Sequence, residues 1–87
     1  MDVYYAYMIK SLSTSLHYYG HTQDLEERMH EHNSGQSPYT KGKGPWRLVG
    51  YKAFQSKSEA SGCELKLKRM KNPSRACSWL KRNGVVR

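Results

Sequence analysis

Two segments near the start of the chain alternate in a way that predicts paired β-strands. Both faces of residues 3–10 are apolar, with Tyr5, Tyr7 and Ile9 on one face and Tyr4, Ala6 and Met8 on the other. A strand with two apolar faces is typical of the middle of a sheet, so we expect this strand to be central. Residues 16–21 predict its antiparallel partner, because only the polar stretch 11–15 separates the two segments.

A third strand is predicted over residues 46–54, after a polar loop at 36–45 that is rich in glycine and lysine. Regular alternation would put Leu48 and Phe54 on one face of this strand and Val49, Tyr51 and Ala53 on the other. The pattern as a whole predicts a protein with both helices and strands (α/β in the broad sense), and within that group the α+β class. We expect a compact three-stranded antiparallel sheet flanked by about three helices.

The first helix is predicted between Asp24, which forms a capping-box-like start with Glu27, and Gly35, which tolerates the left-handed stop. Its core-facing positions, spaced i, i+3, i+4 and i+7, are Leu25, Arg28, Met29 and His32. A half-buried arginine needs an anion, because losing its hydration is costly. We interpret Arg28 as facing a carboxylate or a ligand phosphate. The alternatives are a structural ion pair and a side chain that reaches past Met29 to solvent.

The second helix begins at a capping box, Ser56 with Glu59, and we expect it to run to about residue 71. Its apolar stripe consists of Ala60, Cys63, Leu67 and Met70. Glu64 falls inside that stripe, and a carboxylate that faces the core requires a partner. A last basic helix, at about residues 74–83, is predicted to dock through Ala76, Trp79 and Leu80.

The composition is that of a single globular domain, residues 1–87. A hydrophobic content of 37% with 11% aromatic residues favours a folded core over disorder. The chain has no apolar run of the ~20 residues that span a bilayer and no secretory pattern at its start, so we expect a soluble, intracellular, cytoplasmic protein with nucleoid association left open. Cys63 and Cys77 lie outside metal-site spacing, and His30 and His32 point apart on a helix. We expect reduced thiols and no shared metal at that histidine pair.

The charge distribution predicts a polyanionic partner. The net charge is +8, and every acidic residue lies at or before Glu64. The basic residues that follow are Lys66, Lys68, Arg69, Lys71, Arg75, Lys81, Arg82 and Arg87. Neutralising phosphates releases condensed counterions and gives sequence-independent affinity, which favours nucleic acid. An ordinary solvated basic face, an acidic protein and a membrane surface are the alternatives.

Several polar positions follow one another in a specific order along these elements. They are Tyr5-Ala6-Tyr7, Tyr18-Tyr19-Gly20, Arg28 with His32 one helical turn later, and Glu64. Tyrosine pairs on strands also arise from packing alone, so neither tyrosine segment is specific by itself. Taken together, the order and spacing of these residues resemble the GIY-YIG nuclease domain over about residues 3–71.

The resemblance implies a phosphodiesterase, most simply a DNA endonuclease or a structure-selective nuclease, that acts with one Mg²⁺ or Mn²⁺ ion. Glu64 is suited to bind such an ion as a single carboxylate, because hard cations keep most of their water. Arg28 would face the scissile phosphate with its planar fork of donors. His32 would contact the same phosphate or relay a proton. The expected partner is nucleic acid, with DNA favoured over RNA.

The tyrosines receive their roles by the same resemblance. Tyr18 would be the base and Tyr7 would orient water or phosphate, while Gly20 is a structural position of the second motif. Tyrosine is a poor base at its reference pKa of ~10, so a nearby cation has to favour the phenolate. We expect a phosphate-binding rim composed of Lys41, Lys43, Lys66, Lys68, Arg69 and Arg75.

Three residues depart from the motif for which the family is named. Tyr5, Ala6 and Tyr19 stand where that motif has glycine, isoleucine and isoleucine, whereas every polar position is filled. Further segments resemble the small stand-alone members known as UPF0213-type proteins, and these are residues 32–35, 39–41 and 45–49. The alternatives are a noncatalytic nucleic-acid-binding module on the same fold and a basic protein-interaction domain. Divalent-metal dependence of cleavage would separate the nuclease from the binding module.

Overall fold

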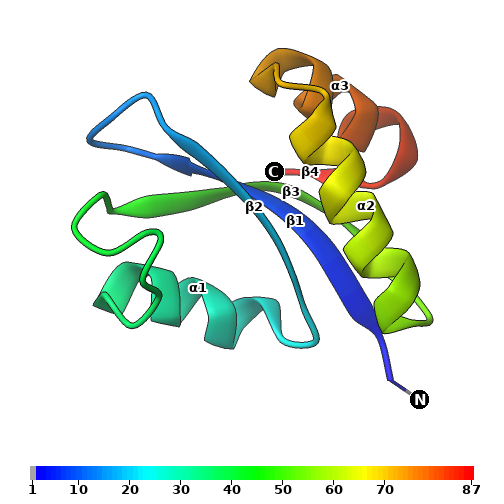
Figure 1. Cartoon of the computed structure of the whole chain (residues 1–87), viewed down its shortest axis with the longest axis horizontal. Helices are drawn as coiled ribbons and strands as arrows, with labels where there is room; N and C mark the ends of the chain where they lie inside the picture. The colour runs from blue at the N-terminus through cyan, green and yellow to red at the C-terminus, as the bar shows by residue number, and fades with distance from the viewer. Residues whose placement is uncertain (1) are drawn as a thin grey trace.

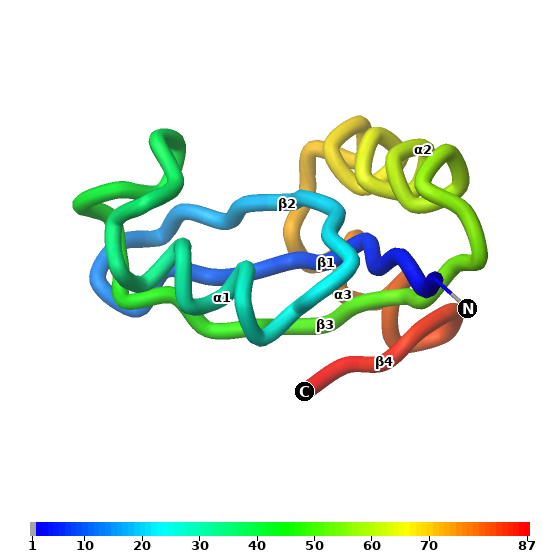
Figure 2. The backbone as a smooth tube through the Cα atoms, turned by 90° about the horizontal axis from the view of Figure 1, so that it is seen from below, coloured from blue at the N-terminus to red at the C-terminus, as the bar shows by residue number. Residues whose placement is uncertain are grey.

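A computed structural model describes residues 2–87 as four strands and three helices (Figure 1). The elements are β1 (Tyr4–Ser11), β2 (His17–Thr22), α1 (Leu25–Ser34), β3 (Trp46–Phe54), α2 (Lys57–Arg69), α3 (Pro73–Asn83) and β4 (Val85–Val86). They form one antiparallel sheet in the order β2-β1-β3-β4 (Figure 2). The predicted α+β class and the internal position of β1 are therefore confirmed.

The expected number of strands is wrong by one. β4 adds a fourth strand, in which Val86 pairs with Gly50 and Val85 with Tyr51. A strand of two residues is too short to show an alternating pattern, so the sequence gives no periodic signal for it. Its position follows from α3, which ends beside β3 and turns the chain back along that strand.

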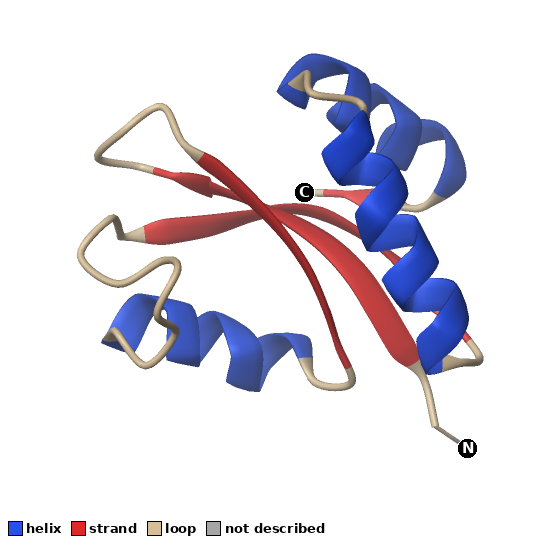
Figure 3. Cartoon of the chain, viewed as in Figure 1, coloured by secondary structure: helices blue, strands red, loops and turns tan. Residues whose placement is uncertain are grey.

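Each face of the sheet is covered by helices (Figure 3). On one face, α1 contributes Leu25 and Met29 to a core around the buried Tyr7, Ile9 and Trp46. On the other face, α2 and α3 pack against the strands over a core of Ala6, Met8, Val49, Cys63, Leu67, Ala76 and Leu80. β1 buries both of its alternating sets of side chains, as expected from its two apolar faces.

The predicted alternation of β3 is also wrong. Leu48 and Tyr51 pack in the core under α1, whereas Val49 and Phe54 pack under α2 and α3. The cause is a β-bulge, since Leu48 and Gly50 pair with consecutive residues of β1 and leave Val49 as the extra residue. The bulge shifts the phase of the strand by one residue, so side chains on its two sides reverse their faces.

The helix boundaries follow their capping residues. The Asp24 carboxylate accepts the Glu27 N–H at 3.1 Å, and Gly35 ends α1 with a φ of 82°. The Ser56 hydroxyl accepts the N–H of Glu59 at 3.1 Å in the same way. α2 ends two residues earlier than expected, at Arg69. None of the helices in the described part of the chain combines the length and the apolar character that a bilayer crossing requires.

Candidate active site

A cavity of about 480 Å³ opens at the edge strand β2. It is lined by Tyr7, Tyr18, Gly20, His21, Arg28, Tyr39, Glu64 and Lys68. Tyr7 and Tyr18 belong to the core under α1, whereas Glu64 and Lys68 come from α2 on the opposite face of the sheet. The cavity therefore straddles the sheet edge and brings side chains from both helical layers to one place.

Gly20 lies where the cavity crosses β2. It pairs with Tyr7 across the β1–β2 ladder, and the tyrosine ring lies directly against it. A Cβ atom at position 20 would stand 2.5 Å from the Tyr7 hydroxyl oxygen and 2.7 Å from Cζ, which is closer than van der Waals contact allows. Only glycine leaves room for this ring, so the space available explains why the second motif has glycine at this position.

The hydroxyl of Tyr7 belongs to a buried hydrogen-bond chain. It lies 2.8 Å from Nε2 of His32, whose Nδ1 lies 2.8 Å from the Thr40 hydroxyl. Burial, reinforced by the nearby charge of Arg28, lowers the pKa of His32 to about 4, so the imidazole is neutral at pH 7. A neutral imidazole donates from one nitrogen and accepts at the other, and the ring is thus held from both sides.

His32 does not line the cavity. Its side chain is 2% exposed and lies behind Tyr7, between that ring and Thr40. The side chain thus has no open surface toward the cavity, and its two expected roles, contact with a substrate phosphate and proton relay, stay predictions. The helical stripe that contains Arg28 and His32 is correct, but the two residues occupy different depths within it.

Tyr7 and Tyr18, the tyrosines of the two motifs, have different surroundings in the cavity. Burial raises the pKa of Tyr7 to about 12, an increase that the hydrogen bond and charge of Arg28 only partly offset, so Tyr7 is a neutral phenol. Tyr18 is half-buried and packs edge-on against His32, with ring centroids 5.2 Å apart. Within residues 2–87 the Tyr18 hydroxyl makes no hydrogen bond. Tyr18, and not Tyr7, therefore offers a free hydroxyl to the cavity.

Arg28 is fixed by three neighbours. Its Nη1 donates to Glu31 at 2.7 Å, its Nε to the Tyr7 oxygen at 3.4 Å and its Nη2 to the Ser37 hydroxyl at 3.5 Å. The structural ion pair considered from the sequence is therefore present. A guanidinium has five N–H donors, so two remain for a ligand, and the residue lines the cavity with its side chain 30% exposed.

Glu64 has a hydrogen-bond donor on each side. Its Oε1 accepts from His21 Nδ1 at 2.7 Å, and its Oε2 accepts from Lys68 Nζ at 2.6 Å. The hydrogen bond to Glu64 raises the pKa of Lys68. The Glu64–Lys68 pair has the favourable i, i+4 order, a spacing that the sequence contains, although we expected Lys68 in the phosphate-binding rim and named no partner for Glu64. His21 was missed, because nothing in the sequence shows that β2 turns this side chain toward α2.

The donor set at Glu64 fits a hard divalent cation but not a site made only of protein ligands. Within the described residues, no three His, Cys, Asp or Glu side chains are grouped as metal ligands. Each Glu64 oxygen has one partner and keeps a further lone pair. A single carboxylate of this kind suits Mg²⁺ or Mn²⁺, which complete their coordination with water and substrate oxygens.

The expected phosphate-binding rim is not continuous. Lys68 is the one member of the predicted set that lines the cavity. Lys66 lies over the Trp79 ring and Arg75 lines a different groove, so both face the α2–α3 side. The remaining members are exposed, and these are Lys41, Lys43 and Arg69.

Tyr39 is a second cavity residue that was missed. Its side chain is 74% exposed and stacks on Tyr18, with centroids 6.5 Å apart and the planes inclined by 24°. The sequence showed it as an aromatic residue in an otherwise polar loop, within one of the segments that resemble the UPF0213-type proteins. Because an exposed aromatic ring at the mouth of a cavity is available for stacking, Tyr39 extends the site beyond the residues of the motifs.

Comparisons with known proteins show the family of the chain. The GIY-YIG catalytic domain family matches residues 3–76 of the chain. A UPF0213 protein of Haloquadratum walsbyi is 38% identical over 68 residues, which cover 77% of this chain and 75% of the relative. A UPF0213 protein of Staphylococcus saprophyticus is 42% identical over 69 residues, covering 78% of this chain and 83% of the relative. The names of these relatives state no activity.

A solved structure shares the fold. The solution NMR structure of a UPF0213 protein from Bacillus halodurans aligns with a TM-score of 0.54 and 32% identity. The alignment covers 94% of this chain and 86% of the other.

Proposed function

The chain belongs to the GIY-YIG nuclease family, and from this membership we propose that it is a divalent-metal-dependent endonuclease that hydrolyses phosphodiester bonds in DNA. The observation that carries the proposal is the convergence of Tyr18, Arg28 and Glu64 on one cavity from three separate elements. These residues supply a free hydroxyl, a cationic fork and a carboxylate. Phosphodiester hydrolysis needs a proton acceptor, stabilisation of phosphate charge and a ligand for an activating cation.

Arg28 binds the scissile phosphate. Its two uncommitted N–H groups reach two phosphate oxygens, and its contacts with Glu31 and Tyr7 fix the plane of the guanidinium beforehand. Preorganised donors of this kind stabilise the charge that develops on phosphorus as water attacks, since they do not have to reorient. Tyr7 is neutral, so its part is to hold Arg28 and to orient the phosphate or the attacking water.

Tyr18 accepts a proton from the attacking water. Its hydroxyl group is free of protein partners, so as the phenolate it takes one proton from water while the water oxygen forms its bond to phosphorus. The P–O bond to the leaving strand then breaks, and that oxygen takes a proton from solvent. A Mg²⁺ or Mn²⁺ ion bound through Glu64 supplies positive charge to the phosphate when it is present.

The substrate we propose is DNA with unpaired bases near the cut, as in a single strand or a branched junction. Tyr39 and Tyr18 form an aromatic stack at the cavity mouth, and unpaired bases stack on such rings regardless of their identity. The preference for DNA over RNA rests on the family resemblance. The net charge of +8 supports a nucleic-acid partner of either kind.

A second candidate, a noncatalytic nucleic-acid-binding module, is favoured by one observation. Both oxygens of Glu64 already have hydrogen-bond partners in the protein, His21 and Lys68, so the carboxylate has a structural use that needs no metal. In this reading the cavity holds a strand without cutting it.

A cleavage panel separates the two candidates. Single-stranded, duplex and branched DNA and RNA are incubated with the purified protein in Mg²⁺, Mn²⁺ or EDTA. Glu64→Gln, prepared identically, reveals any contaminating nuclease, because the amide keeps the shape of the side chain but removes its charge. We expect cleavage of DNA with Mg²⁺ or Mn²⁺ and none with EDTA or with the variant. Binding without metal-dependent cleavage would overturn the nuclease proposal in favour of the binding module.

A further inference from the structure

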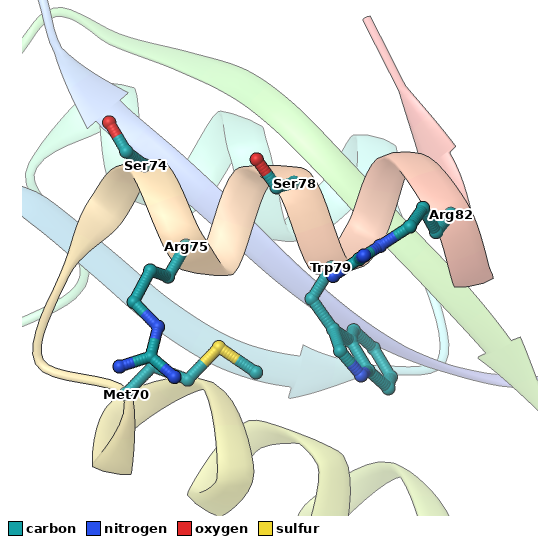
Figure 4. Close-up of a pocket in the computed structure, with 6 residues that line it drawn as sticks. All are labelled: Met70, Ser74, Arg75, Ser78, Trp79 and Arg82. Atoms are coloured by element: carbon teal, nitrogen blue, oxygen red, sulfur yellow. The ribbon is translucent and has the colours of Figure 1, made fainter.

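A second concavity, which we call the α2–α3 groove, lies away from the motif residues. It has a volume of about 260 Å³ and is lined by Met70, Ser74, Arg75, Ser78, Trp79 and Arg82. Arg75 and Trp79 extend from α3 toward Met70, and Arg82 runs back along α3 toward Trp79 (Figure 4). The groove thus combines an apolar floor with two guanidinium groups and two hydroxyls.

The guanidinium groups of this groove have no role in holding the fold together. Arg75 and Arg82 are exposed, and neither takes part in the three ion pairs found within residues 2–87. No acidic residue follows Glu64 in the chain, so α3 carries no carboxylate that could neutralise them. Cations left without partners beside an apolar surface indicate an anionic ligand.

A third cation borders the same surface. Lys66 Nζ lies over the Trp79 ring, 4.9 Å from its centroid, which holds the ammonium group against the indole. Trp79 is half-buried against the core, so its position is set by packing and does not depend on a ligand. Lys66 therefore lies over an aromatic side chain that the fold fixes in place, and Arg75 and Arg82 line the same groove.

The spacing of the charges favours a polymer over a small anion. Arg75 and Arg82 are separated by seven residues of helix, which is about 10.5 Å along its axis. This distance corresponds to about three steps of a stacked nucleic-acid strand at ~3.4 Å each. A single phosphate would need donors that converge on one point, whereas these donors are distributed along a line.

α2 connects the groove to the cavity. Glu64 and Lys68 face the cavity, whereas Lys66 and Met70 face α3. The width of a helix with its side chains is about 10–12 Å, so a strand that crosses α2 needs about four nucleotides to pass from one site to the other. The two sites are thus close enough for one strand to occupy both.

We propose that the α2–α3 groove binds a single strand of the substrate about four nucleotides away from the scissile phosphate, with Arg75 and Arg82 on its phosphates and Trp79 against a base. The inference rests on the proposed function, because the strand is that of the nuclease substrate. The groove, which lies outside the cavity, would thus help to select substrates by their length and topology.

The test compares two double variants that remove the same charge. The groove variant combines Arg75→Gln with Arg82→Gln and removes both cations that line the groove. The control combines Lys10→Gln with Lys81→Gln and removes two exposed cations that line neither the groove nor the cavity. Binding of a labelled single strand of about 20 nucleotides is measured by fluorescence anisotropy over a salt series. The groove variant should reduce the slope of log K against log salt by about 1.4, because each phosphate contact with a single strand contributes about 0.7, and the control should leave it unchanged.

Cleavage kinetics provide a readout that a general loss of charge would not reproduce. For the groove variant we expect KM to rise at least ~10-fold with the long strand, kcat to stay the same, and neither value to change with a strand of about four nucleotides. Trp79 emission should be quenched by the long strand, while Trp46, only 5% exposed, provides a constant background. Circular dichroism confirms that both variants are folded.

Three results would overturn the inference. Equal effects of the two double variants would mean that the groove contributes only general charge. A defect that is the same with short and long strands would place the effect in the cavity. If the groove variant lost binding to phosphatidylserine vesicles but still bound the strand, the groove would be a membrane contact. A wild-type protein that binds long strands through the groove without cutting them would instead contradict only the proposed nuclease activity.

Discussion

The ring of Tyr7 lies against Gly20, its partner across the β1–β2 ladder, so closely that a methyl group on Gly20 would stand 2.5 Å from the tyrosine hydroxyl oxygen. The same hydroxyl contacts His32 at 2.8 Å and receives the Nε–H of Arg28 at 3.4 Å. The backbone of an edge strand therefore sets the position of a side chain on which two other site residues depend.

Gly20→Ala should impair both the stability of the protein and the proposed cleavage through this contact. Displacing the buried Tyr7 ring strains a packed core and should lower the free energy of unfolding by about 1–3 kcal/mol. It should also slow cleavage at least ~10-fold, because Arg28 loses one of its three supports. Urea denaturation and initial rates measure the two effects. Gly62→Ala is the control, since an added Cβ there meets nothing within 4 Å and should stabilise α2.

Arg28→Ala should weaken both binding and turnover. In the proposed mechanism the guanidinium touches the phosphate in the ground state as well as in the transition state, so KM should rise and kcat should fall, the latter by about 100-fold. Steady-state kinetics on the best substrate of the cleavage panel provide the measurement. Glu31→Gln is the informative companion: it leaves the guanidinium in place and removes one neighbour, so it should lower kcat less than Arg28→Ala does. An Arg28→Ala enzyme with unchanged kcat would place the phosphate elsewhere.

His32 should make the stability of the protein depend on pH in a defined window. Its pKa falls from 6.5 when unfolded to about 4 when folded, so its contribution is complete above about pH 6.5 and is lost as pH falls to about 4. The loss amounts to about 3 kcal/mol. Between these limits the free energy of unfolding, measured by denaturation, should change more steeply with pH for the wild type than for His32→Gln. His30→Gln, at an exposed position of the same helix, should leave the pH dependence unchanged.

The aromatic stack at the cavity mouth should determine the preference for unpaired bases. Tyr39→Ala should raise KM for single-stranded DNA by about 10-fold, equivalent to the 1–3 kcal/mol that one base contributes by stacking on an aromatic ring. Tyr39→Trp should retain or improve binding, because the larger ring keeps a flat surface. Fluorescence of 2-aminopurine placed next to the cut would report the stacking directly. Equal KM values for all three proteins would mean that Tyr39 does not touch the substrate.

The features that the sequence predicted are those that depend on local patterns. Capping residues such as Asp24 and Ser56 located two helices, and the stripe that contains Arg28 correctly assigned a polar residue to the inner face of α1. His21 and Tyr39 escaped because their importance depends on tertiary neighbours. A histidine on β2 becomes a partner of Glu64 only when α2 packs against that strand. His32 was placed in the right stripe but at the wrong depth, since periodicity gives direction and not distance from the surface.

The bulge at Val49 gives β3 two phases of alternation, one on each side of that residue. Leu48 faces α1 and Val49 faces the opposite layer, so removing one residue from this strand would exchange the surroundings of every side chain beyond the deletion. Substitutions in β3 alter one contact at a time, whereas a change of length alters a whole half of the strand. Evolutionary drift in this protein is therefore expected to vary the composition of β3 freely within each half while keeping its residue count fixed.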